Sequence, residues 1–294
     1  MSTPEPPLTD PAAVGRVIDR AAHRRTDPEW LAEAWRRSRV VVIEDNHVLV
    51  AGDPLELVLV DPGEAPDGDR LFLGVDGDGV PYFAVAGPLP NVPGATSITL
   101  RGVGTLSERD LDLFTVAAGL VNWHSRYGFS PLSGAATRIG DAGWVRRTAD
   151  GEALIFPRTD PAVIVLVSDG VPGEEGRALL GRGATWPENR FSCLAGFVEP
   201  GESAEATVAR EVYEEVGLPV TDVRYVTSQP WPFPGSLMLA FTAVADPRLP
   251  LCPDLMELAE ARWFTKPDLR KLWDVRKPIT ASVAYYLMAR WLNS

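Results

Sequence analysis

Cysteine is scarce in this sequence, and its scarcity excludes two kinds of stabilising framework. The chain has 294 residues and 2 cysteines, Cys193 and Cys252. Two thiols cannot build a disulfide scaffold or supply the four thiolates of a typical structural zinc site. We therefore expect two reduced cysteines in a fold that is stabilised by a hydrophobic core.

Long apolar runs and a basic leader are also missing. No stretch reaches the roughly 18 apolar residues that a membrane-spanning helix needs. The N-terminus reads MSTPEPPLTDPAA, without a basic segment followed by an apolar one. We therefore expect a cytoplasmic protein with no membrane partner.

Positive charge is in deficit, with 28 lysines and arginines against 40 aspartates and glutamates. The resulting net charge of −12 repels nucleic acid phosphates over most of the surface. Extended duplex binding is therefore disfavoured. A local site in which bound cations reverse the sign stays possible.

Proline and glycine are abundant instead, with 27 and 26 residues. This composition favours short strands and ordered turns over a helical bundle. The sequence pattern divides the chain into four parts: a disordered tail at 1–12, an α+β N-terminal domain at 13–127, a turn-rich connector at 128–158 and a further domain at 159–294.

Hydrophobic periodicity and capping residues predict the main elements. The apolar run at 162–169 is typical of a strand that is buried on both faces. A hairpin is expected through Ala149-Asp150-Gly151. Helices are predicted at 30–39, at 106–127 with Ser107 as N-cap, at 203–217 with Ser203 as N-cap and Gly217 as its end, and at 282–292.

The segment that carries the chemistry contains three glutamates on one helical face. Glu211, Glu214 and Glu215 are spaced i, i+3 and i+4. Carboxylates placed so closely raise one another's pKa unless a cation compensates them. Their oxygens suit hard cations such as Mg²⁺ or Mn²⁺. Taken alone, the same face is also compatible with a solvated acidic surface.

The wider spacing around these glutamates resembles the Nudix box, G-x5-E-x7-R-E-U-x-E-E-x-G-U, where U is a bulky aliphatic residue. Every fixed position matches, from Gly196 through Glu202 and Arg210 to the aliphatic Val212 and Leu218. On this resemblance the chain is identified as a member of the Nudix hydrolases. The resemblance implies metal-dependent cleavage of nucleoside diphosphate linkages and an α/β class fold, an α/β/α sandwich with a mixed sheet.

A second motif narrows the family. The segment Ser228-Gln229-Pro230-Trp231-Pro232-Phe233-Pro234-Gly235-Ser236 closely resembles the SQPWPFPxS signature of NADH pyrophosphatases. Alone, it could also be a rigid aromatic-proline loop over the core. The resemblance implies a homodimer that hydrolyses NADH, and NAD, to nicotinamide mononucleotide and AMP. Some members of this branch remove NAD caps from RNA 5′ ends.

The resemblance also assigns roles to individual residues. The metal ligands would be Glu211, Glu214, Glu215, Glu260 and the carbonyl of Ala195, with Arg210 in the catalytic set. Phe156, contributed by the partner chain, and Phe197 would stack on the base. Arg101 is expected to contact substrate, against the alternative of a surface arginine. The remaining substrate-binding residues would be Gln229, Trp231, Pro232, Phe233, Pro234, Gly235, Ser236 and Ala284.

The chain departs from this family in the connector, where many members carry a zinc ribbon. The two CxxC pairs align with Ser130–Ser133 and Thr148–Gly151, which cannot bind zinc as thiolates do. We therefore expect no zinc, a weakened dimer if the ribbon supports it, and His124 in a packing or surface role. The ribbon's shape could be kept by Phe129, Trp144, Ile155 and Phe156.

Other functions stay open at this point. A broader nucleoside diphosphate-X hydrolase, such as an ADP-ribose pyrophosphatase, would use the same box. NAD-capped RNA decapping would gain little from an acidic surface, so that only the 5′ end would be read. A catalytically dead nucleotide sensor is disfavoured, because the set of glutamates is complete.

Overall fold

The elements of the structure, a computed structural model, fall into two compact units. The structure describes residues 11, 15, 17–99, 102, 106–151, 153–276 and 279–294. The C-terminal unit is built mainly from Asp160–Gln229 and Leu237–Ser294, and the N-terminal unit from Ala13–Thr159 and Pro230–Ser236. Arg101 and the predicted tail at 1–12, apart from Pro11, lie outside the described residues.

The C-terminal unit contains a six-stranded sheet in the order β13-β14-β10-β11-β15, with β12 paired to β10. Neighbouring pairs such as β10–β12 and β11–β15 are antiparallel. The strands are β10 (Asp160–Ser168), β11 (Arg177–Gly183), β12 (Leu194–Phe197), β13 (Thr221–Trp231), β14 (Ser236–Val244) and β15 (Leu258–Thr265).

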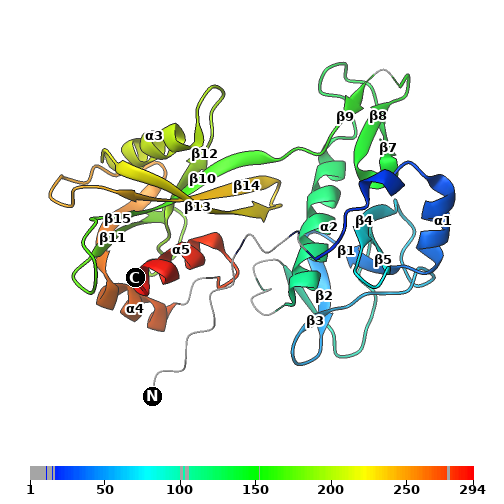
Figure 1. Ribbon diagram of the computed structural model, residues 1–294, viewed down its shortest axis with the longest axis horizontal. Helices are drawn as coiled ribbons and strands as arrows, with labels where there is room; N and C mark the ends of the chain where they lie inside the picture. The colour runs from blue at the N-terminus through cyan, green and yellow to red at the C-terminus, as the bar shows by residue number, and fades with distance from the viewer. Residues whose placement is uncertain are drawn as a thin grey trace. The chain divides into compact units, whose positions relative to one another are not determined.

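Helices cover both faces of this sheet (Figure 1). Along β10, Val163 and Val165 pack toward α3 (Ala204–Val216), whereas Ile164 and Leu166 pack toward α5 (Val283–Leu292). This alternation explains why the strand is a continuous apolar run, since both of its faces are buried. The α/β/α sandwich predicted from the sequence is therefore confirmed.

A further helix on the α5 side, α4 (Lys266–Val275), is absent from the sequence-based prediction. Thr265 caps its first turn by accepting a hydrogen bond from the Asp268 amide, and a proline follows in that turn. Leu269 is fully buried in the same core cluster as α5. The signal was the Thr-x-x-Asp spacing with Pro267, which is typical of a helix start.

Ahead of the connector, the described part of the N-terminal unit contains two small sheets, two α-helices and the short 3-10 helix η2. In the sheet β1-β5-β4, β1 and β5 run parallel, and the second sheet has the order β3-β2-β6. Asp110 and Asp112 of α2 are fully buried and accept backbone amide hydrogen bonds from Leu57 and Ile18. The elements are η2 (Ala22–Arg24), α1 (Pro28–Arg36), β1 (Arg39–Ile43), β2 (His47–Ala51), β3 (Glu56–Leu57), β4 (Leu71–Val75), β5 (Pro81–Ala86), β6 (Thr96–Thr99) and α2 (Glu108–Arg126).

The connector folds as a three-stranded antiparallel sheet, made of β7 (Thr137–Gly140), β8 (Val145–Thr148) and β9 (Leu154–Ile155), with η4 (Asp141–Gly143) between the first two. The pairing of β8 with β9 confirms the predicted hairpin through Ala149-Asp150-Gly151. Hydroxyl oxygens occupy the two turns: Ser130 Oγ accepts from Ser133 N, and Thr148 Oγ1 from Ala153 N.

Candidate active site

Helix α3 is bounded as the sequence predicts. The Ser203 hydroxyl accepts a hydrogen bond from the Ala206 amide at 3.2 Å, which caps the first turn. Gly217 ends the helix in the left-handed conformation with φ 75°. Val208 and Val212 are fully buried against the sheet, and the adjoining side of α3 carries Glu211 and Glu215, which are buried, and Glu214, which is exposed.

Arg210 is the centre of the hydrogen-bond network on that side. Its guanidinium donates to Glu202 at 2.7 Å, to Glu211 at 2.9 Å and to Glu214 at 2.8 Å. It also donates to the carbonyl of Phe197 at 2.9 Å. The planar fork of arginine can serve several acceptors at once. Arg210 therefore ties the end of β12 and the following loop to α3.

Glu202 is fixed in this network by further donors. Its carboxylate accepts from the Glu199 amide at 3.1 Å and from the Thr207 hydroxyl at 2.9 Å. The hydrogen bond from Arg210 and these donors hold the pKa of Glu202 at about 2, well below its usual range. Glu202 is therefore an ionised structural partner of Arg210.

Gly196 allows β12 to approach α3 closely. A Cβ atom built on Gly196 would lie 1.8 Å from Cδ of Glu211. Any larger side chain would therefore displace the Glu211 carboxylate. The glycine of the box has a steric role, because it leaves room for a carboxylate at the strand.

Glu215 is buried with little compensation. The side chain is 7% exposed, and its Oε2 has no hydrogen-bond partner. Burial, and then the charges of Glu211 and Glu257, raise the pKa of Glu215 to about 8. Burial also raises the pKa of Glu211. Two neighbouring buried carboxylates whose charges are incompletely paired favour the binding of a cation beside them.

Glu257 is the additional carboxylate that faces this pair, and sequence reasoning missed it. The loop before β15 is tied to the end of α3, because Asp254 N donates to Glu215 O and Cys252 N donates to Val216 O, both at 2.9 Å. These bonds bring Glu257 next to Glu215. The sequence offers two glutamates three positions apart here, and its pattern alone does not decide which one turns inward.

Glu260, which the sequence-based prediction named as a metal ligand, has other partners. Its carboxylate lies 3.6 Å from Arg182 Nε and 3.6 Å from Arg262 Nε. The charge of Glu257 raises the pKa of Glu215, and Glu257 lines the same cavity as Glu215, whereas Glu260 is not among its lining residues. The structure therefore groups Glu257, and not Glu260, with the glutamates of α3.

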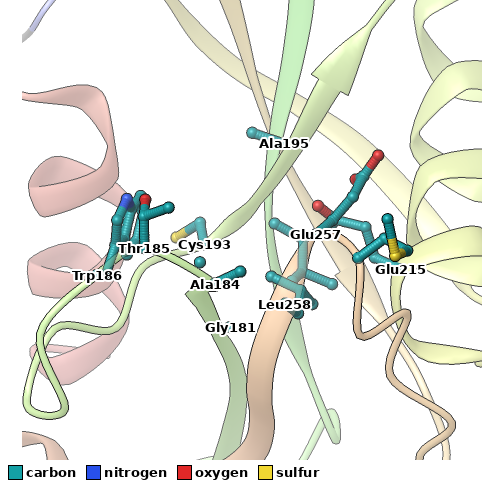
Figure 2. A pocket seen from close by; sticks show the side chains of 12 residues that line it. Gly181, Ala184, Thr185, Trp186, Cys193, Ala195, Glu215, Glu257 and Leu258 are labelled. Carbon is teal, nitrogen blue, oxygen red and sulfur yellow. The ribbon is translucent and has the colours of Figure 1, made fainter.

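A cavity of about 390 Å³ opens beside these carboxylates. Figure 2 shows Glu215 and Glu257 close together on one side, with Thr185 and Trp186 on the other. Ala195, whose carbonyl was predicted to bind metal, also lines it. The remaining lining residues are Gly181, Gly183, Ala184, Cys193, Leu194, Met256 and Leu258.

The donor set fits a hard divalent cation. An unpartnered buried carboxylate oxygen on Glu215, with Glu211 and Glu257 as charged neighbours, has the chemistry that Mg²⁺ and Mn²⁺ prefer. Within the described part of the chain, no group of three or more His, Cys, Asp or Glu side chains is already arranged as a complete metal site. Arg210 engages Glu211 and Glu214, so the full set would assemble only when they reorient.

The predicted substrate-binding residues fall into buried and exposed groups. Phe197 is 59% exposed and Phe156 is 64% exposed, which leaves both rings free to stack. Gln229 is buried, and its side chain donates to Ala281 O at 2.7 Å and accepts from Val283 N at 2.8 Å. Gln229 therefore fixes the start of α5, next to Ala284, rather than reaching outward.

The other residues of the second motif form the tip of the β13–β14 hairpin. Trp231 ends β13 and Ser236 begins β14, so Pro232 to Gly235 form the turn. The rings of Trp231 and Phe233 pack edge to face with centroids 5.8 Å apart. The alternative of a rigid aromatic-proline loop therefore describes only residues 232–235, because residues 228–231 belong to the strand.

Comparisons with known proteins match both units. Residues 158–283 match the model of the NUDIX domain. Residues 31–123 match the model described as the NADH pyrophosphatase-like rudimentary NUDIX domain. Among solved structures, a NUDIX hydrolase from Nitrosomonas europaea aligns with a TM-score of 0.45 at 20% identity, covering 56% of this chain and 90% of that one.

Curated relatives cover most of the chain. A protein of Mycobacterium bovis named NAD-capped RNA hydrolase NudC is 44% identical over 260 residues, which span 86% of this chain and 82% of the relative. A human protein named NAD-capped RNA hydrolase NUDT12 is 36% identical over 204 residues, covering 64% of this chain and 43% of that protein. The likeness to the first relative therefore extends well beyond the box on α3.

Proposed function

This chain belongs to the Nudix hydrolase family, and on that basis we propose that it hydrolyses the pyrophosphate bond of NADH and NAD to nicotinamide mononucleotide and AMP. The observation that carries the proposal is the complete acidic cluster on α3, with the buried and unpartnered Glu215 at its centre. The intact motif at 228–236 and the NADH pyrophosphatase-like match at 31–123 support this choice of substrate.

Divalent cations, Mg²⁺ or Mn²⁺, complete this site in our proposal. Glu211, Glu214, Glu215 and the carbonyl of Ala195 would hold them, and the geometry favours Glu257 over Glu260 as the additional ligand. When bound, the cations supply positive charge that offsets the pyrophosphate and makes water a better nucleophile.

The protein's own residues would position the reactants around that charge. Arg210 holds Glu211 and Glu214 from one side and the Phe197 carbonyl from the other, so it fixes the strand end against the helix. Phe197 presents an exposed ring on which a nucleobase can stack. Gln229 orients the start of α5, where Ala284 would line the substrate.

We further propose a homodimer in which Phe156 of one protomer stacks on the base bound by its partner. The exposed ring of Phe156 supports this role. A cytoplasmic location and the absence of a structural zinc ion also stay predictions. No helix in the described part of the chain is long and apolar enough to cross a membrane.

A substrate panel tests the proposed reaction. Purified protein is incubated with NADH, NAD⁺ or ADP-ribose in the presence of Mg²⁺ or Mn²⁺, and the products are separated chromatographically. We expect AMP and reduced nicotinamide mononucleotide from NADH at a higher kcat/KM than for ADP-ribose cleavage. Cleavage of ADP-ribose without cleavage of NADH would replace this proposal by a broader nucleoside diphosphate-X hydrolase.

Removal of NAD caps from RNA is a second candidate activity, supported by the names of the curated relatives. The net charge of −12 gives the RNA body little electrostatic attraction, so we expect the enzyme to read mainly the 5′ end. Capped RNAs of different lengths should then be cleaved at similar rates. Rates that rise with RNA length and fall steeply with salt would contradict this expectation.

A further inference from the structure

The tip of the β13–β14 hairpin packs within the N-terminal unit. Pro230–Ser236 group with that unit, although the strands leading into the tip belong to the sheet of the C-terminal unit. Pro232 is buried, and it lies over α2 at Gly119, where an added Cβ would stand 3.6 Å from Pro232 Cβ. An added Cβ would only reach ordinary van der Waals contact with Pro232, whereas a larger side chain at this position would enter the space of the tip.

One amide side chain fixes the tip in this place. Asn122, three positions after Gly119 on α2, donates from Nδ2 to the carbonyl of Pro232 at 2.7 Å. The same Nδ2 donates to Oδ1 of Asn46 at 2.5 Å. A backbone carbonyl can only accept, so the amide must present its NH₂ group here, and both hydrogens are used.

Asn46 anchors this arrangement from a third segment. It lies in the turn between β1 and β2 with φ 65°, a left-handed conformation that asparagine tolerates well. Its side chain therefore comes from a short turn with little freedom. The Asn46–Asn122–Pro232 chain of hydrogen bonds joins the β1–β2 turn, α2 and the hairpin tip.

We infer that Asn122 is a positioning residue for substrate binding, and that one task of the N-terminal unit is to hold the hairpin tip. This inference rests on the proposed function, in which the tip lines the substrate site. Asn122 itself would touch no substrate. Its loss would let Trp231 and Phe233 move with the released turn, which weakens binding more than it slows the chemical step.

A pair of asparagine-to-aspartate variants tests the inference. Asn122→Asp keeps the side-chain shape but removes both donated hydrogens and sets a carboxylate against the Pro232 carbonyl. We expect its KM for NADH to rise about tenfold, the scale of one or two lost hydrogen bonds, with kcat within about threefold of wild type. Asn91→Asp, at an exposed loop position, makes the same charge change and should leave both constants unaltered.

Gly119→Leu provides a second route if Asn122→Asp folds poorly. It leaves Asn122 in place and raises helix propensity, but its side chain enters the space of Pro232. We expect the same rise in KM without a fall in Tm. An unchanged KM in both variants would overturn the inference, as would a fall in Tm and kcat with KM unchanged.

Hydrogen–deuterium exchange separates this inference from the proposed reaction. Peptides covering 229–237 should exchange faster in Asn122→Asp than in Asn91→Asp, whether or not NADH is the substrate. Equal exchange in the two variants would overturn the inferred role of Asn122 in holding the hairpin tip. Faster exchange in a protein that leaves NADH intact would support that role and reject only the substrate assignment.

Discussion

At Glu215, burial and like charge act in the same direction, since both disfavour the ionised carboxylate. A carboxyl group in that environment stays ionised only if a positive charge lies beside it, and the proposed cation supplies that charge. We expect Glu215→Gln to lower kcat for NADH at least about a hundredfold, the scale of losing a principal electrostatic stabiliser. Glu214→Gln should have a comparable effect, measured in the same chromatographic assay.

The matched control for both variants is Glu205→Gln, which neutralises an exposed glutamate in the first turn of the same helix. It should retain wild-type turnover. Near wild-type turnover in both single variants, Glu214→Gln and Glu215→Gln, would contradict the assignment of these residues as metal ligands.

Glu257 and Glu260 offer a second comparison at residue scale. Glu257 faces Glu215, whereas Glu260 lies between two arginines. We therefore expect Glu257→Gln to raise the Mn²⁺ concentration required for half-maximal activity at least about tenfold, as loss of a charged ligand would. Glu260→Gln should change it less than about twofold. The reverse ranking in a metal titration would restore Glu260 as the ligand.

The spacing of the box predicted which glutamates share a face of α3, because helical geometry fixes that relation locally. It could not predict Glu257, which reaches the site through backbone hydrogen bonds from a loop to the end of α3. Gln229 shows the same limit. Its motif position suggested contact with substrate, but its amide is used by Ala281 and Val283, more than 50 positions away.

At the scale of elements, the connector shows how a ribbon-like sheet can be held by hydrogen bonds. Arg146 of β8 donates to Thr137 Oγ1 at 2.7 Å and approaches His124 Nδ1 at 3.0 Å. His124 Nε2 lies 2.8 Å from Gly143 O. A neutral imidazole with the proton on Nε2 satisfies both contacts, because Nδ1 then accepts from the guanidinium. His124 therefore joins α2 to the connector.

This arrangement predicts a pH dependence of stability. Burial, reinforced by the charge of Arg146, lowers the pKa of His124 from 6.5 to about 4. Between these values the unfolded state binds more protons, so the contribution of His124 is complete above pH 6.5 and is lost as the pH falls toward 4. We expect the Tm of the wild type to fall more between pH 7 and 5 than that of His124→Gln. Parallel Tm curves for the two proteins would contradict this assignment.

Metal removal gives a separate prediction for the connector. Hydroxyls of Ser130 and Thr148, and not thiolates, accept the backbone amides in its two turns. With Mg²⁺ kept at a saturating concentration, a zinc-selective chelator should therefore leave Tm unchanged, and elemental analysis should find well under one zinc per chain. Thr148→Val should lower Tm by about 2–4 °C, the effect of about 1 kcal/mol in a chain of this size. About one tightly held zinc ion per chain would refute the prediction.

Local patterns predicted the elements whose signals are local. The caps Ser203 and Gly217, the hairpin at 149–151 and the doubly buried strand β10 are examples. Helix α4 was missed because its apolar face is short and its mean hydropathy is low. Its start carries the capping spacing of Thr265 and Asp268, but tertiary packing of Leu269 and Leu272 is what stabilises the apolar face. Pairing order in the sheets depends on long-range contacts that periodicity does not encode.

For the whole molecule, the predicted assembly is a homodimer, and we expect exposed apolar side chains of the connector to lie at its interface. Phe129 and Phe156 are 67% and 64% exposed, and Leu132 is 91% exposed. Light scattering should give a mass near 64 kDa, twice the 31.9 kDa of the chain. Phe156→Ala should raise KM for NADH, and mixing it with an inactive Glu215→Gln protein should restore some wild-type sites. A monomeric mass with full activity would contradict the shared site.

Gly196 has a consequence for genetic experiments on this protein. It carries no functional group, and a survey guided by chemical reactivity would pass over it. Yet a single methyl group at this position would collide with the Glu211 carboxyl, since a Cβ would stand 1.8 Å from its Cδ. A complete mutational scan should therefore recover position 196 as one of the least tolerant in the chain, with alanine rejected as firmly as tryptophan.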